Sequence, residues 1–161
     1  MVSQEQKNQR REDEFERIIV KMPRLLNKLR SSPALRRDSL YGVAQRGIYV
    51  FYDNDIPIYV GRSNRLRQRL LEHSRPSSRH NSATFAFLLA TEEAQGLGFS
   101  SMQRNVLQNE PAFKDIFQEA KERVGRMNVR VVEISDPIEQ TVFELYAALK
   151  LGTPYNDFEN H

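Results

Sequence analysis

The sequence predicts an α+β fold in which helices flank a small, three-stranded and mostly antiparallel sheet. Two short runs of β-branched and aromatic residues, 47–52 and 57–60, are separated by turn-forming residues, which is typical of a β-hairpin. A third alternating run spans 129–134, and the segments around the strands have the three-to-four-residue apolar spacing of helices. The expected order is therefore β-β-α-α-α-β-α behind an extra N-terminal helical segment.

The chain has 161 residues, which suits one domain with a substantial apolar core. We expect a helical extension over residues 1–45 and a main domain over 46–161, with a helical insertion at about 81–125. The absence of cysteine excludes disulfides, zinc-thiolate sites and thiol nucleophiles, and fits a reducing compartment. Because there is neither an apolar signal core nor an apolar run approaching roughly 20 residues, we expect a cytoplasmic protein without a membrane span.

The N-terminal extension is predicted to be helical. Residues 3–14 are almost wholly polar, and we expect them to fray or to extend the helix that follows. Pro23 should kink this helix or start a fresh one. The apolar residues that form its stripe are Phe15, Ile18, Ile19, Met22, Leu25, Leu26 and Leu29. This stripe either packs on the domain, which we favour, or contacts a partner, for example a second copy in a homodimer.

The hairpin brings two tyrosines together. A three-residue loop at 53–55 would pair Tyr52 with Ile56. The same register would place Tyr49 directly opposite Tyr59, with both side chains on one face. A loop one residue shorter would put the two phenols on opposite faces. They are either a reactive pair or, as is usual for strand tyrosines, packing residues.

An arginine-rich helix is expected after the hairpin. Ser63 or Asn64 can cap it, and Leu66 and Leu70 give it a buried stripe. Four basic residues are spaced to stack along one flank of this helix or just before it, namely Arg62, Arg65, Arg69 and His73. The phenols of the hairpin and these side chains can therefore converge.

Two helices are expected in the insertion. The first would start at Asn81 or Ser82 and end at Gly96. The second would run from Pro111 to Gly125, with a well-formed apolar face. The second helix is interpreted as core scaffold without catalytic content, whereas His80 and Asn81 at the start of the first either contact phosphate or, in the case of Asn81, cap the helix.

The last predicted helix carries an isolated carboxylate. Asp136 is a good N-cap, with Pro137 at the first helical position and Glu139 three residues past the cap. Glu144, in contrast, is the only charged residue from 142 to 149. A carboxylate among apolar residues is costly unless it is paired or bound to a metal ion. The residues alone leave an ion pair with an arginine and a metal site equally open.

These segments together resemble the GIY-YIG nuclease superfamily, which includes homing endonucleases, the incision subunit of bacterial nucleotide excision repair and some restriction enzymes. The residues that carry the resemblance are Gly47-Ile48-Tyr49, Tyr59-Val60-Gly61, Arg69, His73, Glu144 and Asn156. They occur in the order of the family, with Arg69 ten residues after Tyr59 and His73 four residues later. The motif residues occupy only the two ends of the stretch from Gly47 to Asn156.

The resemblance implies metal-dependent hydrolysis of DNA phosphodiester bonds. One tyrosine would accept the proton of the attacking water, and Arg69 would contact the scissile phosphate. An isolated phenol titrates near pH 10, so this base needs positive charge from Arg62 or Arg69 to act near neutrality. The family pattern leaves Tyr49 and Tyr59 open as the base. We favour Tyr49, because Tyr59 adjoins the end of a strand, where a positioning role is equally natural.

The resemblance also implies a metal site and two supporting residues. Glu144 would hold one divalent cation, Mg²⁺ or Mn²⁺, since hard cations prefer oxygen ligands. His73 would orient the water or the phosphate, although a lone helical histidine is usually a surface residue. Asn156 would brace the site through hydrogen bonds.

Charge distribution favours a nucleic-acid partner more than net charge does. The 24 basic and 21 acidic residues give a net charge of only +3. Between positions 62 and 79, however, there are six arginines and a single acidic residue. The residues expected to bind DNA are Arg62, Arg65, Arg67, Arg75, Arg79 and His80. The alternatives are a catalytically silent nucleic-acid-binding protein of the same fold, or an interaction module whose tyrosines are merely core.

Overall fold

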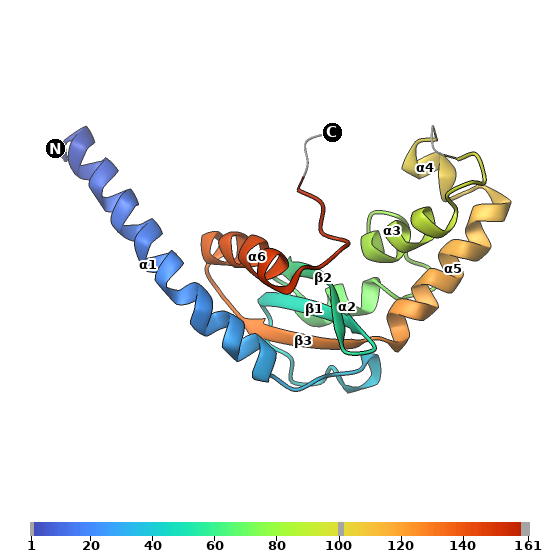
Figure 1. The fold of residues 1–161 in the computed structure, drawn as a ribbon, viewed down its shortest axis with the longest axis horizontal. Helices are drawn as coiled ribbons and strands as arrows, with labels where there is room; N and C mark the ends of the chain where they lie inside the picture. The colour runs from blue at the N-terminus through green and yellow to red at the C-terminus, as the bar shows by residue number, and fades with distance from the viewer. Residues whose placement is uncertain (1, 100–101, 159–161) are drawn as a thin grey trace.

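The computed structural model describes residues 2–99 and 102–158, and its fold is the predicted α+β class. Three antiparallel strands form one sheet in the order β2-β1-β3, with helices on both faces (Figure 1). The elements are α1 (Gln4–Ser31), η1 (Arg37–Ser39), β1 (Gly47–Asp53), β2 (Ile56–Ser63), α2 (Leu66–Glu72), α3 (Thr84–Glu93), α4 (Arg104–Leu107), α5 (Pro111–Arg126), β3 (Asn128–Glu133) and α6 (Pro137–Leu151).

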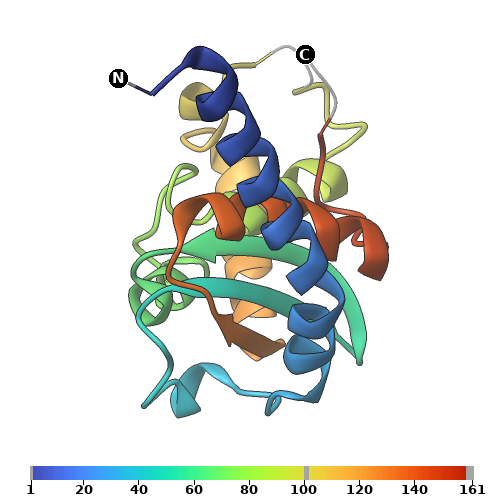
Figure 2. The same ribbon diagram turned by 90° about the vertical axis from the view of Figure 1, so that its left-hand side faces the viewer.

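One face of the sheet is covered by α1 and α6, which lie in front of the strands in Figure 2. The strand residues Ile48, Val50, Val60 and Val132 form a core there with buried residues of both helices. In α1 these are Ile18, Met22, Leu26 and Leu29, so this part of the predicted stripe packs on the domain. The first half of α1 is exposed and extends away from the body (Figure 1), and its contact with a partner stays a prediction.

The opposite face of the sheet is covered by α2, α3 and α5. Strand residues Tyr49, Phe51 and Val129 pack there against Leu66 and Leu70 of α2 and the aromatic residues of α3 and α5. Because successive strand residues point to opposite faces, β1 contributes to both cores in alternation. Tyr49 therefore lies inside the layer formed by the arginine-rich helix and the insertion.

The hairpin loop is one residue shorter than the sequence suggested. Asp53 pairs with Ile56, so the expected pairing of Tyr52 with Ile56 is wrong. Only Asn54 and Asp55 form the loop, with φ of 49° and 65°. Two central residues with positive φ are typical of a type I′ turn, whose twist matches that of the flanking strands, and Asn and Asp tolerate this conformation.

A bulge in β2 keeps both tyrosines on one face despite the short loop. The register shifts after Phe51, which pairs with Tyr59, and Ile58 is left out of the pairing. Tyr49 consequently lies opposite Gly61, and the prediction that it faces Tyr59 directly is wrong. The extra residue compensates for the shorter loop, so the two phenols are diagonal neighbours with ring centroids 6.4 Å apart.

Helix α1 continues through Pro23 and ends at Ser31, so no fresh helix begins at the proline. Helix α6 begins as predicted, since Oδ1 of Asp136 accepts the backbone N–H of Glu139 at 2.8 Å. Helix α2 has no side-chain cap: its N-cap is Arg65, and Ser63 instead accepts the backbone N–H of that residue.

The insertion helices differ from the prediction at three ends. Helix α3 begins at Thr84 rather than at Asn81 or Ser82, because the carbonyl of Arg79 holds residues 79–83 in a turn. It ends at Glu93, before Gly96. Helix α5 continues past Gly125, where an added Cβ would lie 3.3 Å from Cβ of Ser74, so this glycine serves a close approach of two segments. None of the described helices is both long enough and apolar enough to span a membrane.

Candidate active site

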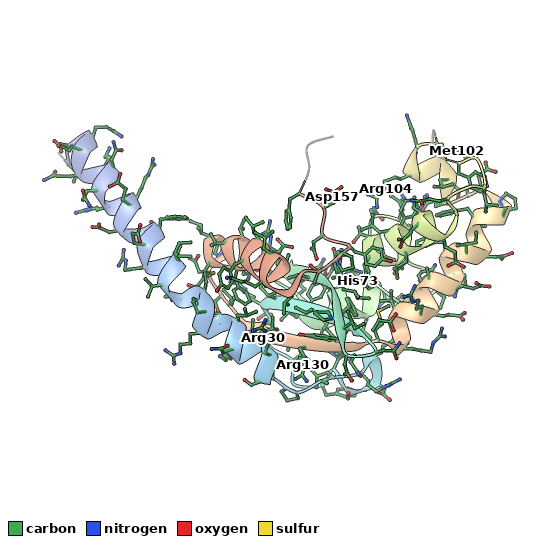
Figure 3. The ribbon with its side chains drawn as sticks, in the orientation of Figure 1. Arg30, His73, Met102, Arg104, Arg130 and Asp157 are labelled. Atoms are coloured by element: carbon green, nitrogen blue, oxygen red, sulfur yellow. The ribbon has the colours of Figure 1, made fainter. Side chains whose placement is uncertain are left out.

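The centre of the site is a hydrogen bond between two buried side chains. Tyr49 on β1 is 1% exposed, and His73, the C-cap of α2, is 0% exposed. Oη of Tyr49 lies 2.7 Å from Nε2 of His73, near the middle of the molecule (Figure 3). The tautomer of the ring decides which atom donates, and Nδ1 has no hydrogen-bond partner among the described residues. These two residues can share one proton, and we call them the Tyr49–His73 dyad.

Gly61 makes room for the dyad. A Cβ at this position would lie 2.3 Å from both Cζ and Oη of Tyr49, far inside van der Waals contact. Any side chain would therefore push the phenol away from His73. The Tyr59-Val60-Gly61 motif therefore needs glycine at position 61, because Tyr49 occupies the space that a side chain would fill.

Aromatic rings enclose the histidine. The imidazole centroid lies 5.5 Å from that of Tyr49, 5.3 Å from Phe51 and 5.9 Å from Tyr59, in each case edge to face. Tyr59 itself stacks on Phe85 of α3, with centroids 4.6 Å apart and rings nearly parallel. This apolar cage holds the two rings of the dyad in fixed positions and excludes water from them.

The cage keeps both members of the dyad neutral. Burial raises the pKa of Tyr49, and the negative charge of Glu144 adds to the effect, while Arg69 opposes it. Burial also lowers the pKa of His73 well below its ordinary value of 6.5, and the charge of Arg69 lowers it further. At neutral pH the dyad is a phenol beside an unprotonated imidazole, which can take up a proton.

The buried histidine should make stability depend on pH. Below about pH 6.5 the unfolded chain binds a proton at His73 that the folded chain does not. The free energy of unfolding should therefore fall as the pH is lowered from 6.5 to 5, by at most about 1.4 kcal/mol per pH unit for this group. Urea unfolding at a series of pH values would measure this slope. The slope should be lost in His73→Gln and kept in His80→Gln, and equal slopes in the two variants would contradict the prediction.

Arg69 lies beside the dyad and is held by the insertion. Its Nη1 donates to the carbonyl of Ser82 at 2.7 Å, and its Nη2 donates to Oγ1 of Thr84 at 3.0 Å. A longer ion pair of 3.7 Å joins Nη1 to Glu72 on the same helix. Since a guanidinium has five N–H groups, these contacts fix its plane and leave other donors for a ligand.

Tyr59 is the more accessible of the two phenols. It is half-buried, and burial raises its pKa. A hydrogen bond with Thr84 and the charges of Arg69 and Arg104 lower this pKa, whereas the charge of Glu144 raises it.

Glu144 forms an ion pair across the edge of the sheet. Nε of Arg62 on β2 lies 2.9 Å from Oε2 of Glu144 on α6. Burial raises the pKa of Glu144 above its ordinary value, and Arg62 opposes that shift. The ion pair that the sequence left open is therefore formed, and it lies on the α6 side of strand β2.

Asn156 fastens the segment after α6 to strand β2. Its Oδ1 accepts the backbone N–H of Val60, and its Nδ2 donates to the carbonyl of Val60, both at 2.8 Å. Oγ1 of Thr153 donates to the same Oδ1. The side-chain amide of Asn156 thus makes the two hydrogen bonds that the backbone of an adjacent strand would make. These bonds fix β2 at Val60, between Tyr59 and Gly61.

The predicted flank of four basic residues does not form. His73 hydrogen-bonds with Tyr49 of the sheet and Arg69 with Ser82 of the insertion, whereas Arg62 lies beside α6. Arg65 is exposed, and its Nη1 donates to Gln68. The cause is the start of α2 at Leu66, which leaves Arg62 on the strand and Arg65 at the N-cap.

The remaining arginines named from the sequence are exposed near α2 and α3, whereas His80 is half-buried. Arg67 is exposed and lies over the ring of Tyr41, 5.2 Å from its centroid. Arg75 and Arg79 are exposed. The backbone N–H of His80 donates to Gln108, and its buried Nδ1 has no hydrogen-bond partner among the described residues. No sequence signal separated these exposed residues from Arg69.

Sequence reasoning missed the part of the site that the insertion supplies. Thr84 and Phe85 at the start of α3 touch Arg69 and Tyr59, respectively. Arg104 of α4 lies over the ring of Phe87, 4.7 Å from its centroid, and its charge reaches Tyr59. One signal was available for Arg104, because it is the only charged residue from 97 to 109.

The donor set fits a metal ion only if oxygens from water or from a substrate complete its coordination. Among residues 2–99 and 102–158, no group of three or more His, Asp or Glu side chains gathers to hold a metal ion. Glu144 offers one carboxylate whose Oε1 accepts no hydrogen bond from a described residue. Mg²⁺ is commonly held by one or two carboxylates together with waters and phosphate oxygens, so Glu144 suits this ion.

Comparison of the chain with protein-family models, with curated proteins and with solved structures found no match. The resemblance to GIY-YIG nucleases therefore rests on the motif residues themselves, and membership of that family stays a prediction. Inferences about the chemistry of the protein therefore depend on the geometry of the site's own side chains.

Proposed function

We propose that this protein is a metal-dependent endonuclease of the GIY-YIG type that hydrolyses phosphodiester bonds in DNA. The observation that supports this most strongly is the Tyr49–His73 dyad, with its 2.7 Å hydrogen bond, beside Arg69. The hydrogen bond between Tyr49 and His73, with Tyr59 next to both rings, favours a site over an interaction module with tyrosines that only pack.

The dyad supplies the proton acceptor. Hydrolysis requires removal of a proton from the attacking water, and the phenol oxygen of Tyr49 can accept it while its own proton passes to Nε2 of His73. The lowered pKa of His73 keeps it unprotonated at neutral pH, so Nε2 is free to receive the proton, and it also makes His73 a weaker base than an exposed imidazole. The transfer does not require a free phenolate, which the burial of Tyr49 disfavours.

Arg69 and the exposed arginines supply positive charge for phosphate. Arg69 lies beside the dyad, and its unused N–H groups can donate to the oxygens of the scissile phosphodiester. The exposed Arg65, Arg67, Arg75 and Arg79 can contact other phosphates along the same nucleic acid. The phosphate contacts position the strand, and they do not by themselves select a sequence.

Glu144 is the proposed ligand of one Mg²⁺ or Mn²⁺ ion. When bound, such an ion supplies Lewis-acid stabilisation of the charge that develops on the phosphoryl oxygens. Asn156 keeps β2 and the segment after α6 together, and thereby holds Tyr59 and the carboxylate in a fixed relation.

A catalytically silent nucleic-acid-binding protein is the second candidate. The observation that favours it is the burial of both members of the dyad, together with the two hydrogen bonds that engage Arg69. A substrate water can reach Tyr49 only if the side chains around it move. Such a protein would keep the basic surface and would not turn over.

The test is incubation of the purified protein with supercoiled plasmid DNA. The nuclease should nick the plasmid in the presence of Mg²⁺ or Mn²⁺ and stop when a chelator is added. Binding should weaken as salt is raised, because phosphate contacts release counterions. Salt-sensitive binding without nicking in either metal would reject the nuclease and favour the silent protein.

A further inference from the structure

The contact between Arg62 and Glu144 is unusually sparse for an arginine and a carboxylate. A single pair of atoms, Nε and Oε2, makes the hydrogen bond at 2.9 Å. Neither Nη atom of Arg62 and neither lone pair of Oε1 hydrogen-bonds with a described residue. The bidentate arrangement that makes such pairs strong is therefore absent from this contact.

The two partners differ in how firmly they are held. The side chain of Arg62 is 46% exposed, whereas that of Glu144 is 25% exposed and rises from a helix packed on the sheet. Since exposed ion pairs change an equilibrium constant by only about fivefold or less, the contact is easily broken. When it breaks, Arg62 is the partner that can turn into solvent.

Glu144 nevertheless needs a positive partner. A carboxylate that is largely removed from water is destabilised when it lacks a compensating charge. Arg62 provides that charge in the free protein, and a divalent cation on the same carboxylate would provide it instead. Each weakens the binding of the other, because a guanidinium and a divalent cation on one carboxylate repel each other.

We propose that Arg62 and the divalent cation compete for the carboxylate of Glu144, an inference that rests on the proposed metal site. Arg62 holds the carboxylate charged and oriented while the cation is absent, and it releases the carboxylate when the cation binds. The displaced guanidinium, which is exposed and lies three residues before the exposed Arg65, can then pair with a nucleic-acid phosphate, and this pairing removes the competitor. Cation and nucleic acid then favour each other's binding, as linkage requires.

The competition is tested by titrating the protein with Mn²⁺ alone. The electron paramagnetic resonance signal of free Mn²⁺ measures binding, and no measurement of activity is needed. Arg62→Gln should lower the dissociation constant of Mn²⁺ by about two- to fivefold relative to Arg65→Gln. The latter is the matched control, because it removes one positive charge from a nearby exposed arginine that does not touch the carboxylate. Arg62→Lys, which keeps a charge able to pair, should stay close to the wild type and provides a second variant if Arg62→Gln folds poorly.

Two outcomes would separate the inference from the metal site itself. Equal Mn²⁺ affinities in Arg62→Gln and Arg65→Gln, combined with loss of binding in Glu144→Gln, would reject the competition and keep the metal site. Unchanged Mn²⁺ binding in Glu144→Gln would reject the metal site and the competition together.

Discussion

Replacing Tyr49 with phenylalanine is expected to lower the rate of DNA cleavage by a factor of roughly 10²–10⁴, the range for lost general-base help, with little change in DNA affinity. Phenylalanine keeps the ring inside its cage and removes only the oxygen that lies 2.7 Å from His73. The loss should therefore fall on the chemical step. Nicking rates and salt-dependent DNA binding of the same preparations would measure the two quantities separately.

Tyr59→Phe is the matched control for that variant. Its ring stacks on Phe85, and the phenylalanine substitution preserves this contact. Because the hydroxyl of Tyr59 hydrogen-bonds with Thr84, whereas that of Tyr49 hydrogen-bonds with His73, its removal should cost less than the removal of the Tyr49 hydroxyl. Wild-type rates in both variants would refute base catalysis by tyrosine, and a larger loss in Tyr59→Phe would assign the base to the more accessible phenol.

The hairpin illustrates how far local patterns predict this fold. Alternation and turn-forming residues were sufficient to place both strands, and the cap at Asp136 was sufficient to place the start of α6. The bulge at Ile58 was not predictable, because its cause is non-local: Tyr49 has to lie over Gly61, which has no side chain. The predicted loop was one residue too long, and the bulge was not predicted. These two errors cancel, so the prediction that both tyrosines lie on one face of the sheet is confirmed.

The site residues that follow the spacing of the GIY-YIG motif could be predicted from the sequence. The contacts that join segments distant in the chain could not. The motif residues named from the sequence include both members of the dyad and Asn156, which fixes strand β2. Thr84 reaches Arg69 because a turn after Arg79 brings the insertion against that arginine. No pattern in the sequence indicates this contact. The insertion is consequently part of the site as well as scaffold.

The burial of His73 was also not predicted from the sequence. A histidine four residues after an arginine on a short helix is ordinarily a surface residue, and its neighbours in the chain give no contrary sign. Its cage comes from Phe51, Tyr59 and Phe85, which lie on three different elements. Only the folded structure reveals that the two rings of the dyad are shielded from water.

Replacing Glu144 with glutamine is expected to reduce cleavage by roughly 10³-fold or more while leaving the melting temperature unchanged or slightly higher. A lost metal ligand removes several kcal/mol of transition-state stabilisation, and each 1.36 kcal/mol is a factor of ten in rate. The pKa of Glu144 is raised by burial, so its charged form destabilises the folded state. Removing the charge relieves that cost, and the single contact with Arg62 that is lost is worth only about 0–1 kcal/mol.

Glu139→Gln is the control for this substitution, because Glu139 lies on the same helix and also forms one ion pair of 2.9 Å, with Lys21. It should cleave at the wild-type rate with a similarly small change in melting temperature. Cleavage by Glu144→Gln within a few-fold of wild type would contradict the metal assignment. A melting temperature lowered by many degrees in Glu144→Gln alone would mean that the ion pair with Arg62 is the main role of this carboxylate, since an ordinary surface pair shifts a protein of this size by about 2–4 °C at most.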